Sequence, residues 1–134
     1  PAEAKKPLFE RLGGTDGITA VVDDFVNRAA ADPKVNFTRL GVMERPWDAT
    51  PENVALLKQR LVQFISVATG DPNGNYEGKD MKTAHEGMKI TNAEIDALAA
   101  DLVAALQKFN VPEQEQKELL DIVGTTRGVI VEQA

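Results

Sequence analysis

The stretch Gly17–Ala31, GITAVVDDFVNRAAA, has the clearest structural pattern in the chain. Its apolar residues recur at helical intervals and share one face: Ile18, Val21, Val22, Phe25, Val26 and Ala29. The pair Gly13-Gly14 before it predicts a tight corner, because glycine accepts positive φ angles. Asp32 ends it, since a residue before proline avoids the helical region. We therefore expect a long amphipathic helix here, preceded by a short helical piece at Leu8–Leu12.

Three further segments show helical spacing, and no segment convincingly predicts a strand. Thr50 and Pro51 start a helix that reaches about Thr69, with one apolar face formed by Val54, Leu57, Leu61, Phe64, Ile65 and Ala68. Thr91 or Asn92 caps the next, whose stripe is Ile95, Leu98, Ala99, Leu102, Val103 and Leu106. Pro112 opens the last, with inward residues Leu119, Ile122, Val123, Thr126, Val129 and Ile130 and its end at Val131. The sequence thus predicts an all-α fold.

Composition limits the function classes. The chain has 134 residues, of which 43% are hydrophobic, and this suits one folded domain at residues 8–134 after a flexible tail at residues 1–7. A net charge of -6 without a basic stripe argues against nucleic-acid binding, and no apolar stretch is long enough for a membrane span. The absence of cysteine excludes disulfides, thiolate metal sites and cysteine nucleophiles. Because the chain starts at Pro1 without methionine, we expect export to the periplasm, or otherwise a cytoplasmic location.

His85 is the only histidine of the chain and lies on a short segment, Met81–Gly87, between two glycine-bearing loops. Histidine is a common metal and haem-iron ligand, but a lone histidine is more often an ordinary surface or core residue. Asp and Glu do not cluster around it at zinc-ligand spacing, and the chain has no G-x-S-x-G nucleophile elbow and no phosphate-binding glycine loop. A function for His85 can therefore be assigned only from a longer sequence pattern that includes it.

That wider pattern resembles the truncated haemoglobins of the first group. The opening Leu8–Gly14, LFERLGG, and the helix carrying Asp23-Asp24-Phe25 both match the start of that family. The motif Tyr76-x-Gly78-x-x-Met81-Lys82-x-x-His85 is similar to the family's loop and short proximal segment. The likeness covers nearly the whole chain after residue 7 and continues through Ile90-Thr91, the helix with Leu98 and Leu102, and Val111-Pro112.

The resemblance implies a shortened globin fold, in which two antiparallel helix pairs sandwich a non-covalent haem b. By position, His85 would be the proximal iron ligand, with Met81 contacting the haem beside it. Residues implied on the distal side are Phe25, Val26, Phe37, Leu57, Leu61 and Phe64, and the further haem contacts are Tyr76, Ile90 and Leu98. Lys58 and Arg60 are candidates for the haem propionates. Plain core packing is the alternative for the apolar members of this set.

The distal side departs from the family pattern at Val26, where the family usually has a tyrosine that donates a hydrogen bond to bound oxygen. The distal helix has two alternative registers, which present either Leu57 and Leu61 or Gln59 and Gln63 to the ligand. We favour the leucine register, because the other one would turn the apolar face of the helix to solvent.

The stretch Gly41–Thr50 looks like an insertion before the distal helix, and it leaves the alignment of Phe37 open. Trp47 within it either covers the haem edge or packs on the surface, and we favour packing. A single histidine excludes bis-histidine ligation within one chain, which leaves Lys58 or Met43 as alternatives for a sixth iron ligand.

An apolar distal pocket has a chemical consequence. A polarised hydrogen bond is worth about 1.5–3 kcal/mol, or roughly ten- to hundredfold in affinity, and such a pocket forfeits it for oxygen. We expect fast oxygen loss and easy autoxidation, with less effect on carbon monoxide and nitric oxide. The favoured function is a globin that reversibly binds diatomic gases, as a monomer or weak dimer. The alternatives are a haem-dependent nitric oxide dioxygenase or redox protein served by an electron-donor reductase, and a haem-free helical interaction module.

Overall fold

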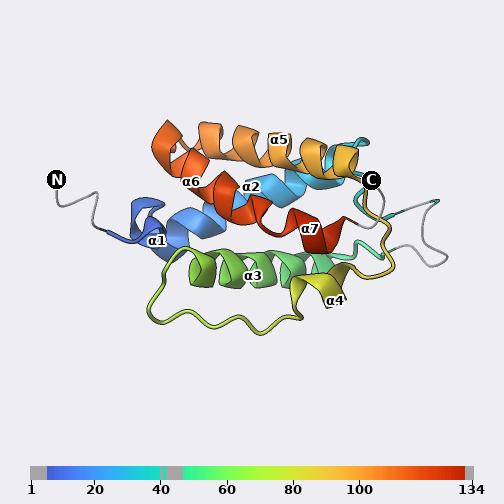
Figure 1. Cartoon of the computed structure of the whole chain (residues 1–134), viewed down its shortest axis with the longest axis horizontal. Coiled ribbons are helices and arrows are strands. Elements are labelled where there is room, and N and C mark those ends of the chain that lie inside the picture. Colours follow the sequence, from blue (N-terminus) through green and yellow to red (C-terminus); the bar gives the residue numbers. More distant parts are fainter. Residues whose placement is uncertain (1–5, 40, 42–46, 132–134) are drawn as a thin grey trace.

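The computed structural model describes residues 6–39, 41 and 47–131, and the regular structure of these residues is helical, as the sequence predicts. In chain order the helices are α1 (Leu8–Arg11), α2 (Gly14–Ala31), α3 (Pro51–Ala68), α4 (Met81–His85), α5 (Asn92–Lys108), α6 (Glu113–Gly124) and α7 (Arg127–Ile130). Helix α2 packs against both α3 and α5, and α6 returns alongside α5. In Figure 1, α5 runs along the upper edge and α3 along the lower edge, with α4 beside α7.

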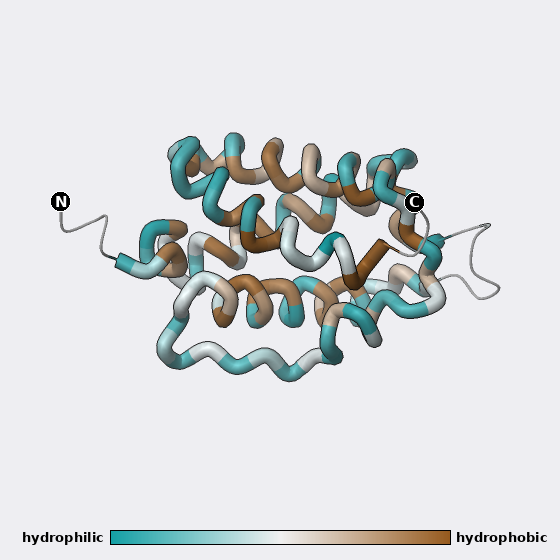
Figure 2. The backbone as a smooth tube through the Cα atoms, viewed as in Figure 1, coloured by the Kyte–Doolittle hydropathy of each residue, from teal (hydrophilic) through white to brown (hydrophobic). Residues whose placement is uncertain are grey.

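One apolar core joins these helices. The predicted face of α2 is buried along its whole length, which confirms the spacing argument. The core comprises Leu8, Leu12, Ile18, Val21, Val22, Phe25, Val26, Ile65, Leu102, Ala105, Leu106 and Leu119. Figure 2 shows the same alternation on the tube, with hydrophobic and hydrophilic residues taking turns along each long helix. Burial of such side chains supplies the main favourable term in folding.

The glycine corner before α2 is confirmed. Gly13 and Gly14 have φ angles of 96° and 67°, in the left-handed region that favours glycine. The helix begins at Gly14, three residues before the predicted start at Gly17. A Cβ atom on Gly17 would lie 2.2 Å from the carbonyl oxygen of Leu12, so this glycine permits the close approach between α1 and α2.

The starts of α3 and α5 follow their sequence signals. The Thr50 side chain accepts a hydrogen bond from the amide of Asn53. Thr91, rather than Asn92, caps α5, and it forms a reciprocal capping box with Glu94. Each cap satisfies backbone donors that a helix start otherwise leaves without partners.

The prediction of one continuous last helix is wrong. The helix breaks after Gly124, and a separate turn, α7, carries Arg127–Ile130. The hydroxyls of Thr125 and Thr126 each donate to the carbonyl three residues earlier, at 2.6 Å, and such bonds compete with the helical ladder. As a result Val129, predicted to point inward, has 48% of its surface exposed, and Val131 is extended.

Within the described residues, none of the helices has both the length and the apolar character of a membrane span. Of the expected tail, residues 1–5 lie outside the described part of the chain, as does Met43. Between α3 and α4 an irregular segment crosses below α3 in Figure 1, and this segment contains Tyr76 and Gly78.

Candidate functional site

A cavity of about 680 Å³ lies among α2, α3, α4 and α5, within the range of about 300–1,000 Å³ that is usual for ligand pockets. The structure brings nearly all of the predicted site residues to its wall: Phe25, Val26, Phe37, Leu57, Arg60, Leu61, Phe64, Tyr76, Met81, His85, Ile90 and Leu98. These residues come from sequence positions up to 73 apart, so the fold rather than local sequence gathers them. Lys58 is the exception and is absent from the wall.

His85 reaches the cavity from the last residue of α4. Asp80 caps that helix: its side chain accepts a hydrogen bond from the amide of Thr83, and hydrogen bonding with Thr83 lowers the pKa of Asp80. The Nδ1 atom of His85 lies 2.8 Å from the carbonyl oxygen of Met81. Because a carbonyl only accepts hydrogen bonds, Nδ1 carries the proton of the neutral ring, and Nε2 keeps the lone pair that a metal needs.

The leucines of α3, not its glutamines, face the cavity. Leu57 and Leu61 lie on its wall, whereas Gln59 is exposed. Gln63 is directed to the loop after α3, where its amide donates to the Glu77 carboxylate at 2.7 Å and its oxygen accepts from the Glu77 amide at 3.1 Å. The register favoured from the sequence is therefore the one in the structure.

Trp47 packs on a neighbouring side chain, as favoured from the sequence, and it also lines the cavity. Its indole packs edge-to-face on the ring of Phe37, with 5.3 Å between ring centroids and an interplanar angle of 84°. Both rings lie on the cavity wall. The aromatic pair thus forms part of the wall, and stacking of this kind adds to the stabilisation from burial alone.

Tyr76 and Gly78 form a small unit on the loop before α4. The Tyr76 hydroxyl donates to the carbonyl of Lys79 at 2.5 Å, and the ring packs edge-to-face on Phe64 at 5.7 Å. A Cβ atom on Gly78 would lie 2.4 Å from the Tyr76 hydroxyl oxygen, so any larger residue there would force the Tyr76 ring to move. This contact gives the Y-x-G spacing a physical reason.

The cations differ from the sequence-based assignment. The Lys58 ammonium binds Asp23 at 2.7 Å and Asn27 at 3.1 Å, so the structure gives no support to its propionate or iron-ligand roles. Arg60 is on the wall, partly exposed, and 3.6 Å from Glu77. Lys79 also lines the cavity, and the sequence offered no signal for it.

Arg39 is the wall residue that sequence reasoning missed most clearly. Its guanidinium is buried and binds Glu94 at 2.6 Å. It follows α2 in a segment without helical spacing, so periodicity could not mark it. Among the described residues, no group of three or more His, Asp or Glu side chains could hold a metal ion directly. A metal ion at His85 would therefore need a cofactor to supply its other ligands.

Comparison with known proteins agrees with this geometry. The "Bacterial-like globin" family profile matches residues 7–132. The chain belongs to the bacterial-like globin family. A group 1 truncated hemoglobin from Tetrahymena thermophila is 30% identical over 124 residues, which cover 92% of this chain and 93% of the relative.

Solved structures of truncated hemoglobins have the same fold as this chain. The truncated hemoglobin of Tetrahymena pyriformis, in its Fe(III) form, superposes with a TM-score of 0.80 at 25% identity, covering 94% of this chain and 98% of that one. The 2/2 hemoglobin of Synechococcus sp. PCC 7002, with covalently attached heme, gives a TM-score of 0.75 at 29% identity, covering 92% and 95%. The truncated globin fold expected from the sequence is confirmed, and the family implies a haem-binding protein that takes diatomic gases.

The cavity fits that cofactor. Haem is a flat apolar ring with an iron centre and two anionic propionates. The wall offers a largely apolar surface, one imidazole whose Nε2 keeps its lone pair, and the cations Arg60 and Lys79. Each part of haem therefore has a counterpart of matching chemistry among the described residues.

Proposed function

We propose that this globin holds haem b without a covalent bond, with His85 as the proximal iron ligand, and that it reversibly binds carbon monoxide, nitric oxide and oxygen. When bound, haem would supply an iron centre that can bind one diatomic gas molecule. The observation that supports His85 is its hydrogen bond to the Met81 carbonyl, which fixes the tautomer and directs the lone pair to Nε2. The absence of cysteine argues against thioether attachment, so haem should leave the protein on acid extraction into butanone.

The distal wall decides which gas is favoured. Val26 and the leucines Leu57 and Leu61 present only carbon to the cavity, and none of them can donate a hydrogen bond. Oxygen as a ligand gains more from a donor than carbon monoxide or nitric oxide does. We therefore expect oxygen to leave quickly, and carbon monoxide and nitric oxide to bind with little loss.

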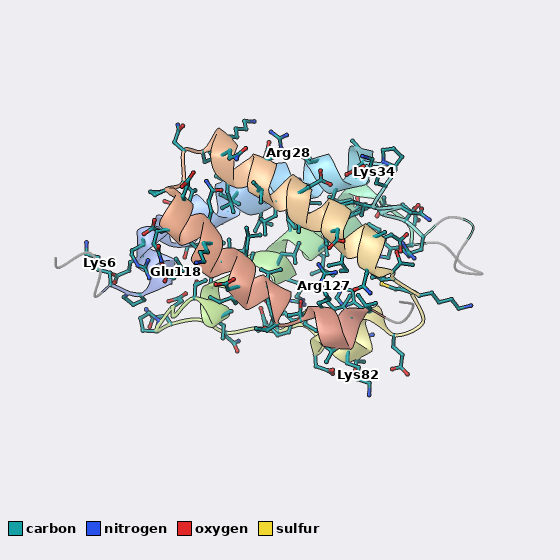
Figure 3. All side chains as sticks on the ribbon, turned by 45° about the horizontal axis from the view of Figure 1, so that its top comes forward. Lys6, Arg28, Lys34, Lys82, Glu118 and Arg127 are labelled. Atoms are coloured by element: carbon teal, nitrogen blue, oxygen red, sulfur yellow. The ribbon has the colours of Figure 1, made fainter. Side chains whose placement is uncertain are left out.

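The test of the cofactor site uses two variants on α4. The protein is produced with haem available, and its spectrum is recorded oxidised, reduced, and reduced with carbon monoxide. We expect about one haem per chain, lost or weakened in His85→Gly and restored when free imidazole is added. Lys82→Ala is the matched control, because Lys82 lies on the same helix and points away from the protein (Figure 3). Full haem retention with an unchanged spectrum in His85→Gly would refute the proposal.

A further inference from the structure

Arg39 is buried to an unusual degree for an arginine, with 3% of its surface exposed. Its backbone is also in the left-handed region, with φ of 62°, which costs energy for a residue with a side chain. A buried charge must be repaid by an ion pair and by hydrogen bonds. The side chain therefore sits where the surrounding structure holds it firmly.

The guanidinium of Arg39 binds three separate segments. On its own segment, Nη1 donates to the carbonyls of Val35 at 3.3 Å and Asn36 at 3.5 Å. On the segment after α4, Nε donates to the Met88 carbonyl at 3.0 Å and Nη2 to the Lys89 carbonyl at 3.2 Å. On α5, Nη1 forms the ion pair with Glu94 at 2.6 Å.

Glu94 links this contact to the start of α5. Its other carboxylate oxygen accepts the Thr91 amide at 3.0 Å in the capping box. Burial opposes the charged form, but bonding to Arg39 and Thr91 outweighs it and lowers the pKa of Glu94. The pair thus stays ionised, and one arginine fixes the segment after α2, the segment after α4 and the first turn of α5 relative to one another.

A short chain of hydrogen bonds connects Arg39 to His85. The Met88 carbonyl accepts from Arg39, and the Met88 amide donates to the His85 carbonyl at 3.1 Å. The His85 ring in turn bonds Met81. Helix α4 has only five residues, so its position depends on such outside contacts. Arg39 also lies on the cavity wall, as do Met88 and Glu94.

We propose that Arg39 is a positioning residue for His85: it holds the segment after α4 and so sets the orientation of the proximal imidazole toward the iron. The same contact joins that segment to the stretch after α2 that carries Phe37, another residue of the cavity wall. This inference rests on the proposed haem site. Two carbonyls, of Met88 and Lys89, and the Glu94 carboxylate hold the guanidinium, and only the planar, five-donor group of arginine can bind all three at once.

The test compares three substitutions at this contact. Arg39→Met removes all donors, and Arg39→Lys keeps the charge but cannot reach both Met88 and Lys89 with Glu94. The double variant Arg39→Met with Glu94→Gln avoids an unpaired buried carboxylate. Arg11→Met is the matched control, since Arg11 forms a comparable ion pair with Glu118 on α6. Figure 3 places Glu118 at the opposite end of the molecule from Lys82 on α4.

The first readout is the iron–histidine stretching band of the reduced, ligand-free protein in resonance Raman spectra. We expect the band to shift and broaden in Arg39→Met and in the double variant, with Arg39→Lys between them and the parent. We also expect haem to transfer to apomyoglobin at least tenfold faster. Arg11→Met should lower the Tm and leave both properties unchanged. An unaltered band and transfer rate in the double variant would overturn the inference.

The second readout needs no haem. Hydrogen exchange of the apoprotein should accelerate in the peptides covering residues 81–89 when Arg39 is replaced, and not when Arg11 is replaced. Unchanged exchange there would also count against the inference. The two proposals fail differently: a parent protein without stoichiometric haem overturns the haem site, whereas normal haem binding with no effect of Arg39→Met or the double variant overturns only the role of Arg39.

Discussion

The two halves of α2 carry similar apolar side chains, but other helices cover the first half, whereas the second half borders the cavity. In the first half, Ile18, Val21 and Val22 meet α1, α3, α5 and α6, and the gap left among them is about 10 Å³, no larger than one water molecule. In the second half, Phe25 and Val26 face the cavity of about 680 Å³. The sequence pattern is the same in both halves. The first half completes its own core, and the second leaves room for a cofactor to complete it.

The largest expected effect is a difference in the free energy of unfolding of the apoprotein between substitutions beside the two halves of α2. Leu106 is fully buried against the first half. Leu106→Ala should lower the free energy of unfolding by about 2–5 kcal/mol, because the surrounding side chains fill the space left behind only in part. Leu61, on the cavity wall, should cost less than about 1 kcal/mol in the same apoprotein, because its side chain already borders open space. Urea unfolding measures both.

Adding haem should reduce the difference between the stability losses from Leu106→Ala and Leu61→Ala. A ligand that binds only the folded state stabilises it, and Leu61→Ala removes contacts with the proposed ligand. The loss from Leu61→Ala should therefore grow in the haem-loaded protein, while that from Leu106→Ala stays similar. Equal losses from the two variants in the apoprotein would contradict the division of α2 into two halves.

The next effect tests whether the second half of α2 faces the bound gas, through the rate of oxygen dissociation. Val26→Tyr adds a hydroxyl to the cavity wall and should slow oxygen dissociation about ten- to hundredfold, the equivalent of about 1.5–3 kcal/mol. Val26→Phe adds the ring without the donor and is the control. Stopped-flow oxygen release measures both, and a Val26→Tyr protein no slower than Val26→Phe would show that this position does not face the ligand.

The smallest effect concerns the far end of α2. Asp101 on α5 lies beside Asp32, and its Oδ2 has no hydrogen-bond partner among the described residues. Burial first, then the neighbouring Asp32 carboxyl, raises the pKa of Asp101 from 3.8 to about 6. Because the folded state holds this proton more tightly than the unfolded state does, stability is gained as pH falls toward about 4 and lost as pH rises through about 6.

Asp101→Asn should remove this dependence and raise stability at neutral pH, by less than about 1 kcal/mol because solvent screens a partly exposed group. Thermal melts at a series of pH values between about 4 and 8 measure it. Asp121→Asn, which changes an exposed carboxyl on α6, is the control. A pH profile of the Asp101→Asn protein that matches the parent would disprove the assignment.

Much of the fold followed from local chemistry that the sequence displays directly. The glycine corner at Gly13 and the cap at Thr50 depend on neighbouring residues alone, so the sequence predicted them, and it narrowed the cap of α5 to Thr91 or Asn92. The break near Thr125 was missed, because hydroxyl bonds to carbonyls are a weak signal in the sequence, and the contact of α7 with α4 joins segments that are distant in the chain.

For the site, the sequence by itself determined the long helices α2, α3 and α5, most of their apolar faces, and His85 as the only available imidazole. Tertiary structure alone decided what covers each face, because periodicity reports that a side chain is buried and not what it is buried against. It separated Val22, in the closed core, from Val26, on the cavity wall. It also turned Lys58 away and brought Arg39 in, since the partners of a charge lie on segments distant in sequence.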